Sequence, residues 1–129
     1  MATSKNNILG LGELEKEIME VLWQRGSGTV REVLETLHTK RSLAYTTVMT
    51  VMARLADKEL LRREALPNGS FLYVPSQSKE ALYAATSKSF FKELIKYSST
   101  VAVAQFVDVL EHTDQKELAK LKAFLQQRV

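Results

Sequence analysis

Residues 43–75 read LAYTTVMTVMARLADKELLRREALPNGSFLYVP, and this stretch decides the fold. From about residues 43–45 to residue 58 its apolar residues recur at helical spacing, in a single stripe of Val48, Val51, Met52 and Leu55. The period then becomes strand-like at residues 60–65 and 70–74, on either side of Leu66-Pro67-Asn68-Gly69. An Asn-Gly pair between two short apolar runs is the strongest local signal of a β-hairpin. The stretch therefore predicts a helix followed by a hairpin.

Two further helices are expected upstream of this stretch. Residues 11–24 form an amphipathic pattern, which Gly26-Ser27-Gly28 interrupts. Thr29 then precedes a second helix, and Glu32 three residues later completes a capping box. Three helices followed by a hairpin is the element order of a winged helix. We expect a mostly α fold with a small β-hairpin, a winged helix-turn-helix.

Downstream of the hairpin no strand pattern returns. Ser78 is the expected cap of a helix that runs through Tyr97, and residues 98–100 interrupt it. An apolar segment, residues 101–110, precedes a last helix from about residue 114 to residue 127. The sequence thus predicts a flexible tail (residues 1–7), a winged-helix DNA-binding domain (8–75) and a helical dimerisation domain (76–129).

The C-terminal part carries four phenylalanines but is too short to enclose them. A segment of this length rarely builds a closed core of its own, and burial against a second copy is the simplest solution. The alternative is that this C-terminal segment (the arm, residues 76–129) folds back on the N-terminal winged-helix domain (the head, residues 8–75). The residues expected in the dimer contact are Leu82, Phe90, Phe91, Leu94, Phe106, Leu110, Leu118, Leu121 and Leu125.

Composition excludes several classes of function. The chain has 129 residues, 45% of them hydrophobic and 26% charged, as expected of a folded protein. It has no cysteine, which excludes disulfides, thiolate catalysis and cysteine metal sites. His38 and His112 stand apart, and no catalytic constellation is recognisable. We expect no enzyme, no metal and no cofactor. No signal peptide or membrane-length apolar run is present, so we expect a cytoplasmic protein without membrane insertion.

Positive charge gathers around the third predicted helix. The net charge is only +3, but residues 40–63 contain six basic residues against two acidic ones. Short hydroxyl side chains near the start of this helix would let its backbone approach base edges. The candidates for base contact are Thr46, Thr47, Thr50 and Arg54. The candidates for phosphate-backbone contact are Tyr45, Lys40, Arg41, Lys58, Arg62, Arg63 and Asn68.

Two alternatives to a DNA-reading protein stay open at this point. A winged helix can serve as a protein-interaction module, although a neutral or acidic third helix would favour that function and this one is basic. A regulator that senses a small molecule would need a pocket between head and arm.

The sequence also resembles a known family over most of its length. LEKEIMEVLW (residues 14–23), TVREVLETL (29–37), LAYTTVMTVMARLADKELLRRE (43–64) and FLYVP (71–75) closely resemble the penicillinase repressor family, the BlaI/MecI/CopY type. The resemblance implies a homodimer that represses transcription from a two-fold operator on double-stranded DNA. In the penicillinase branch it implies control of genes for β-lactamase or an altered penicillin-binding protein, and release triggered by a membrane zinc metalloprotease sensor.

Two features distinguish this chain within the family. The copper-sensing branch uses paired cysteines near the C-terminus, so a chain without cysteine does not share that mode. The resemblance also implies a cleavage site in the arm, at an Asn-Phe bond in the best-known members. The matching stretch here is VAVAQFVDVL (residues 101–110), which places Gln105-Phe106 at that position. Glutamine in place of asparagine is a departure from the family pattern.

Overall fold

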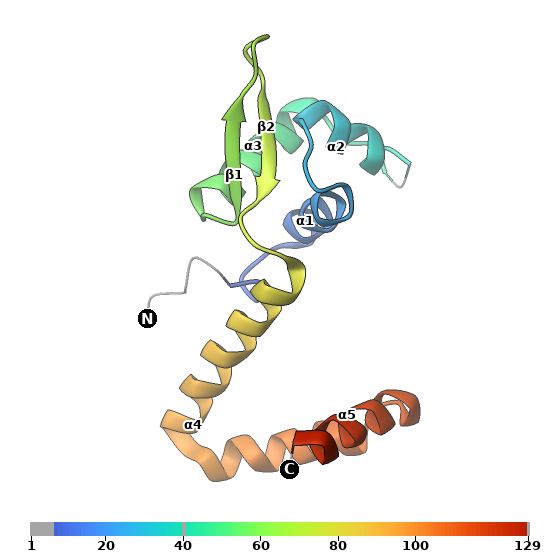
Figure 1. Ribbon diagram of the computed structural model, residues 1–129, viewed down its shortest axis with the longest axis vertical. Coiled ribbons are helices and arrows are strands. Elements are labelled where there is room, and N and C mark those ends of the chain that lie inside the picture. Colours follow the sequence, from blue (N-terminus) through green and yellow to red (C-terminus); the bar gives the residue numbers. More distant parts are fainter. Residues whose placement is uncertain (1–6, 40, 129) are drawn as a thin grey trace. The chain divides into compact units, whose positions relative to one another are not determined.

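The computed structural model describes residues 7–39 and 41–128, which form two compact units, one up to Lys88 and one from Ser89 onward. The expected tail, except for Asn7, lies outside the described residues. The elements are α1 (Glu13–Arg25), α2 (Val30–Leu37), α3 (Tyr45–Asp57), β1 (Leu61–Ala65), β2 (Phe71–Pro75), α4 (Lys79–Glu111) and α5 (Gln115–Arg128) (Figure 1).

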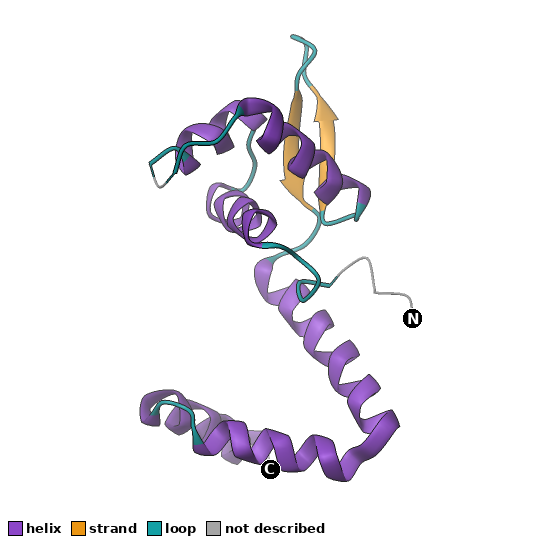
Figure 2. Cartoon of the chain, turned by 180° about the vertical axis from the view of Figure 1, so that it is seen from behind, coloured by secondary structure: helices purple, strands orange, loops and turns teal. Residues whose placement is uncertain are grey.

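The first unit has the predicted fold class, mostly α with one β-hairpin (Figure 2). β1 and β2 pair antiparallel, in a register that runs from Leu61 opposite Pro75 to Ala65 opposite Phe71. Gly28 extends this sheet by one bridge, because its N–H and C=O exchange hydrogen bonds of 3.0 and 2.9 Å with Tyr73. A Cβ on Gly28 would lie 3.1 Å from Cδ2 of the buried Leu22, so the close approach of backbone and core favours glycine here.

One apolar core joins the three helices to the hairpin. The inward stripe predicted for α3 is confirmed, since all four of its residues are buried. They pack with residues of α1, α2, the turn between α3 and β1, and both strands, of which the most deeply buried are Ile18, Met19, Leu22, Val33, Leu60, Leu61 and Tyr73. This packing fixes which face of α3 points away from the core.

Local signals place the helix ends that position α3. The capping box of α2 is confirmed: Oγ1 of Thr29 accepts a hydrogen bond from the N–H of Glu32, whose carboxylate accepts from the N–H of Thr29. α3 ends in a Schellman-type turn, in which the N–H of Leu60 donates to the carbonyl of Leu55. Glu59 has the left-handed backbone of that turn, with φ +65°. The turn leads the chain directly from α3 into β1.

The start of α4 belongs to the head, beyond the expected boundary at residue 75. The indole N–H of Trp23 donates to the carbonyl of Gln77 at 3.1 Å, and the N–H of Ile8 donates to Oγ1 of the buried Thr86, also at 3.1 Å. Leu82 is fully buried in the head core. The prediction that Leu82 contacts a second copy is therefore wrong, because its apolar surface is already covered within one chain.

The second unit contains the remainder of α4 and α5. Ser98 has extended backbone angles (φ −166°, ψ 105°) that interrupt α4 within the predicted break at residues 98–100. The apolar segment after it is helical up to Glu111. None of the described residues of this unit is buried. Of the helices in residues 7–39 and 41–128, none combines the length and apolar character that a membrane span requires.

Candidate nucleic-acid interface

The face of α3 that points away from the core carries the predicted base-contact residues. Thr46 and Thr50 are one helical turn apart, on the side opposite the buried stripe, and both are exposed. Thr47 and Arg54 are also exposed. Arg54 lies one helical turn before Lys58, which is paired with Glu15 of α1, so Arg54 is on the flank of α3 nearer α1. The structure therefore brings all four candidates to one accessible helix.

Two of the predicted backbone-contact cations are held by carboxylates of α1. Nζ of Lys58 lies 2.7 Å from Oε2 of Glu15, and a guanidinium nitrogen of Arg41 lies 2.6 Å from Oε1 of Glu17. Burial raises the pKa of Glu15, but hydrogen bonds from Lys58 and from the N–H of Gly12 outweigh it and lower the pKa. The Lys58 pair thus holds the C-terminal end of α3 to α1, and the Arg41 pair holds the turn between α2 and α3 to α1. Lys40 lies outside the described residues.

The other predicted cations are available to an external anion. Arg54, Arg62 and Arg63 are exposed, and within residues 7–39 and 41–128 none of them forms an ion pair. The guanidinium of Arg63 lies 5.1 Å from the ring centre of Phe71 on the neighbouring strand. Stacking of this kind orients a guanidinium while leaving its N–H groups free to donate. The hairpin thus presents oriented positive charge.

Asn68 organises the tip of the hairpin. Its Oδ1 accepts hydrogen bonds from the N–H and the hydroxyl of Ser70, at 3.1 and 2.6 Å. The N–H of Gly69 closes the turn on the carbonyl of Leu66, and Gly69 itself has φ +88°. The carbonyl side of the Asn68 amide is therefore used inside the loop, and only its NH₂ group remains for an external contact.

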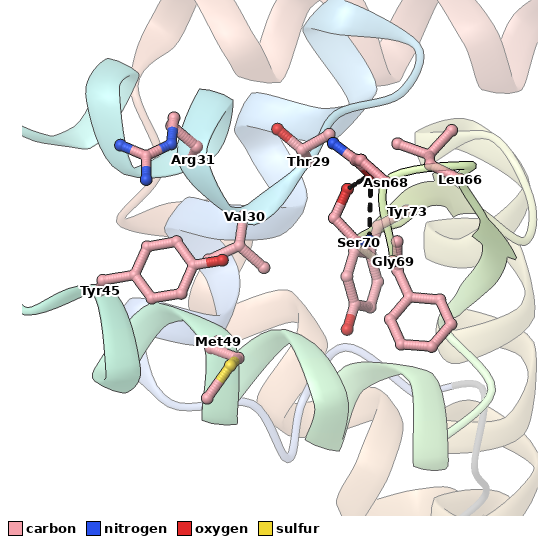
Figure 3. Close-up of a pocket in the computed structure, with 11 residues that line it drawn as sticks. Thr29, Val30, Arg31, Tyr45, Met49, Leu66, Asn68, Gly69, Ser70 and Tyr73 are labelled. Carbon is pink, nitrogen blue, oxygen red and sulfur yellow. Dashed lines mark hydrogen bonds between the residues drawn. The ribbon is translucent and has the colours of Figure 1, made fainter.

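A groove of about 470 Å³ lies between α2, α3 and the hairpin (Figure 3). Its walls include Arg31 on α2, whose guanidinium lies 5.8 Å from the ring centre of Tyr45 on α3. Met49, one helical turn after Tyr45, is exposed toward the same groove. The full lining is Thr29, Val30, Arg31, Tyr45, Met49, Leu66, Asn68, Gly69, Ser70, Phe71 and Tyr73.

Sequence reasoning missed Arg31 and Met49. Met49 falls one position outside the buried stripe of α3, so helical spacing alone would have placed it on the accessible side. Arg31 had no such signal, because it precedes the basic stretch and its proximity to Tyr45 arises only when α2 packs on α3.

The second unit presents a separate apolar surface. Its groove of about 580 Å³ is lined by Phe90, Phe91, Leu94, Tyr97, Ser98, Val101, Ala102, Gln105, Phe106 and Val109. Of the predicted dimer-contact residues, Leu110 and Leu118 are partly exposed, and those exposed further are Phe90, Phe91, Leu94, Phe106, Leu121 and Leu125. Gln105-Phe106 lies inside helical α4.

Comparison with known proteins identifies the family. The sequence profile described as "Penicillinase repressor" matches residues 11–127. "Transcriptional regulator BlaI" of Mycobacterium tuberculosis is 44% identical over 75 residues, which cover 57% of this chain and 54% of that protein. The match thus spans about half the length of that relative. "Methicillin resistance regulatory protein MecI" of Mammaliicoccus sciuri is 24% identical over 123 residues, which cover 95% of this chain and 98% of the relative.

Solved structures agree on the fold. The solution structure of the DNA-binding domain of the repressor BlaI aligns with a TM-score of 0.50 at 24% identity, over 61% of this chain and 90% of that domain. A MarR mutant from E. coli aligns with a TM-score of 0.51 at 14% identity, over 92% of this chain and 78% of that one. At these identities the structures support the winged-helix fold, and the profile match over residues 11–127 carries the family. The chain belongs to the penicillinase repressor family.

Proposed function

We propose that this protein is a DNA-binding transcriptional repressor, not an enzyme, in which α3 reads the major groove and the hairpin contacts the phosphate backbone. The observation that carries the proposal is the accessible face of α3. Thr46 and Thr50 lie opposite the core, and the short hydroxyl and methyl groups of threonine suit base edges. Arg54 on α3 and the arginines of β1 supply charge to hold phosphates. The names of the family and of its relatives support the same function.

The proposed repressor acts in the cytoplasm as a homodimer on a two-fold operator. The second unit supports dimerisation, because it exposes large apolar side chains and none of its described residues is buried. Apolar area of this kind is stabilised by contact with a partner, and identical chains associate most often in two-fold pairs. On this basis the two copies of α3 meet half-sites about 34–36 Å apart, or a multiple of that distance.

Release is proposed to act through the second unit. A membrane protease sensor that cuts Gln105-Phe106 would remove Phe106 and all of α5 from the dimer contact, while leaving the head complete. Because this bond lies within helical α4, cutting it requires the helix to open locally, and the rate of cutting then follows the open population. Cleavage at this bond is supported by the family match, because the penicillinase repressor profile covers residues 11–127 and this range includes the bond.

The test is selection of duplexes from a random-sequence pool by the full-length protein, followed by footprinting and by affinity measurement across salt concentrations. The expected result is an inverted repeat protected by two chains, with affinity that falls steeply as salt rises. A protein that retains no duplex above background even at low salt would overturn the proposal and favour a protein-interaction module. A single asymmetric site occupied by one chain would overturn the dimer clause alone.

A further inference from the structure

We infer that the groove between α2, α3 and the hairpin holds one sugar–phosphate strand of the DNA, and that Arg31 is a phosphate-contacting residue oriented there by Tyr45. The inference rests on the proposed function and adds to it a site and a residue. The position of the groove supports it. A winged helix places α3 in the major groove and its hairpin against the flanking backbone, so a strand of the duplex must pass between these two elements.

The charge of the groove selects for an anion. Its lining contains one charged side chain, Arg31, and no carboxylate. Within the described residues Arg31 forms no ion pair. Arg25, by contrast, is held by Glu32 at 2.9 Å. An unpaired guanidinium at the wall of a groove without carboxylates attracts a phosphate and has N–H donors to bind it.

The ring of Tyr45 restrains the position of the Arg31 guanidinium. The guanidinium lies 5.8 Å from the ring centre of Tyr45, close to the face that attracts cations. Tyr45 in turn points its hydroxyl into the groove (Figure 3). This cation–π contact restrains the Arg31 side chain without using its N–H groups as hydrogen-bond donors, so less side-chain freedom is lost when a phosphate binds.

The remaining walls suit a deoxyribose rather than a free inorganic anion. Val30, Met49, Phe71 and Tyr73 give the groove apolar surface, which matches the C–H faces of the sugar. Asn68 sits at the hairpin end with its NH₂ group unused in the loop. The groove therefore joins an apolar face for a sugar to hydrogen-bond donors on α2, α3 and the loop for its phosphates.

The test uses the full-length protein and a fluorescein-labelled duplex of mixed sequence, with affinity measured at several salt concentrations. Arg31→Ala should weaken binding roughly tenfold and reduce the slope of log affinity against log salt by about one unit, on every sequence alike. Arg31→Lys should restore the slope but only part of the affinity, because an ammonium keeps the charge without the planar fork of donors that a guanidinium offers a phosphate. Lys16→Ala is the matched control: it removes one exposed cation from α1, outside the groove, and should leave the slope unchanged.

The outcomes separate this inference from the proposed function. If the unmodified protein binds no duplex, the proposed function fails. If it binds with a steep salt dependence and Arg31→Ala matches it in affinity and slope, the groove is not a backbone site and only the inference fails. Arg31 is exposed, so the variants should keep the fold; circular dichroism and thermal melts that match the unmodified protein verify this. A Tyr45→Phe variant, which keeps the ring, should lose affinity without losing the Arg31 contribution to the slope.

Discussion

Nζ of Lys58 lies 2.7 Å from Oε2 of Glu15, and this ion pair joins the end of α3 to the first turn of α1. The pKa of Glu15 results from two opposing effects. Burial raises it, and the hydrogen bonds from Lys58 and from the N–H of Gly12 lower it by more. The folded head therefore favours the ionised form of the Glu15 carboxylate, and the ion pair that this form makes holds the end of α3 against α1.

A pH dependence of stability follows from this pair. Because the folded pKa of Glu15 is below its ordinary 4.5, the stabilisation is present above pH 4.5 and is lost as the pH falls through the folded value. At neutral pH, Glu15→Gln should lower the free energy of unfolding by less than about 1 kcal/mol, since the Lys58 partner is partly exposed. Urea unfolding of both proteins at neutral pH and at about pH 3 tests this. A difference that stayed constant across that range would contradict it.

The Glu15–Lys58 ion pair distinguishes Lys58 from Arg62, although the sequence predicts both residues as phosphate contacts. Arg62→Ala should flatten the salt dependence of DNA affinity by about one unit, because Arg62 is exposed and available to a phosphate. Lys58→Ala should change that slope less and the unfolding midpoint more, since Lys58 already has a carboxylate partner. Anisotropy titrations across salt, paired with thermal melts, provide both readouts. Equal slope changes for the two variants would show that Lys58 leaves Glu15 when DNA binds.

Sequence preference should depend on the accessible threonines of α3. Thr50→Val keeps the shape of the side chain and removes its hydroxyl, so it should alter which base pair is preferred, at about 1–3 kcal/mol for a lost contact. Thr36→Val is the matched control, because Thr36 is exposed on α2 and its hydroxyl donates to the carbonyl of Glu32. Selection of duplexes by each variant is the measurement. If Thr50→Val weakened all sequences equally, α3 would not be the reading helix.

A side chain at Gly28 should destabilise the head. A methyl group there would lie 3.1 Å from Cδ2 of the fully buried Leu22, and overpacking of this kind costs about 1–3 kcal/mol. Gly28→Ala should therefore lower the unfolding midpoint, with DNA affinity reduced only in proportion to the unfolded fraction. Gly10→Ala is the control, since a Cβ at Gly10 meets nothing within 4 Å. A Gly28→Ala protein as stable as the control would mean that Leu22 moves aside without cost.

Loss of the arm should abolish cooperative binding without changing the head. A chain that ends at Gln105 lacks Phe106, Leu110 and all of α5, which are proposed contacts with the second copy. It should sediment as a monomer and bind a two-fold operator about 10²–10⁴-fold more weakly, because the second half-site contact is no longer intramolecular. Analytical ultracentrifugation and operator titration decide this. A truncated chain that still dimerises and binds like the full chain would rule out the arm as the point of control.

The head shows where sequence reasoning succeeds. The spacing of apolar residues in α3, the Thr29–Glu32 capping box and the Asn-Gly hairpin are all local signals, carried by residues within one or two turns of one another. Each of them is found in the structure. Leu82 shows the opposite case. Its apolar character was evident, but nothing local says which apolar surface it joins, and the structure gives it to the head core.

From the sequence alone, local periodicity determined the element order, the buried face of α3 and the cluster of positive charge around it, because helix and strand periods are set by the backbone itself. Only the tertiary structure decided how those charges are used. It paired Lys58 with Glu15 and Arg41 with Glu17, and it placed Arg31 over Tyr45 at the groove. These partners are separated along the chain and meet only when α1, α2 and α3 pack on a shared core, so their contacts depend on a geometry that no short stretch of sequence specifies.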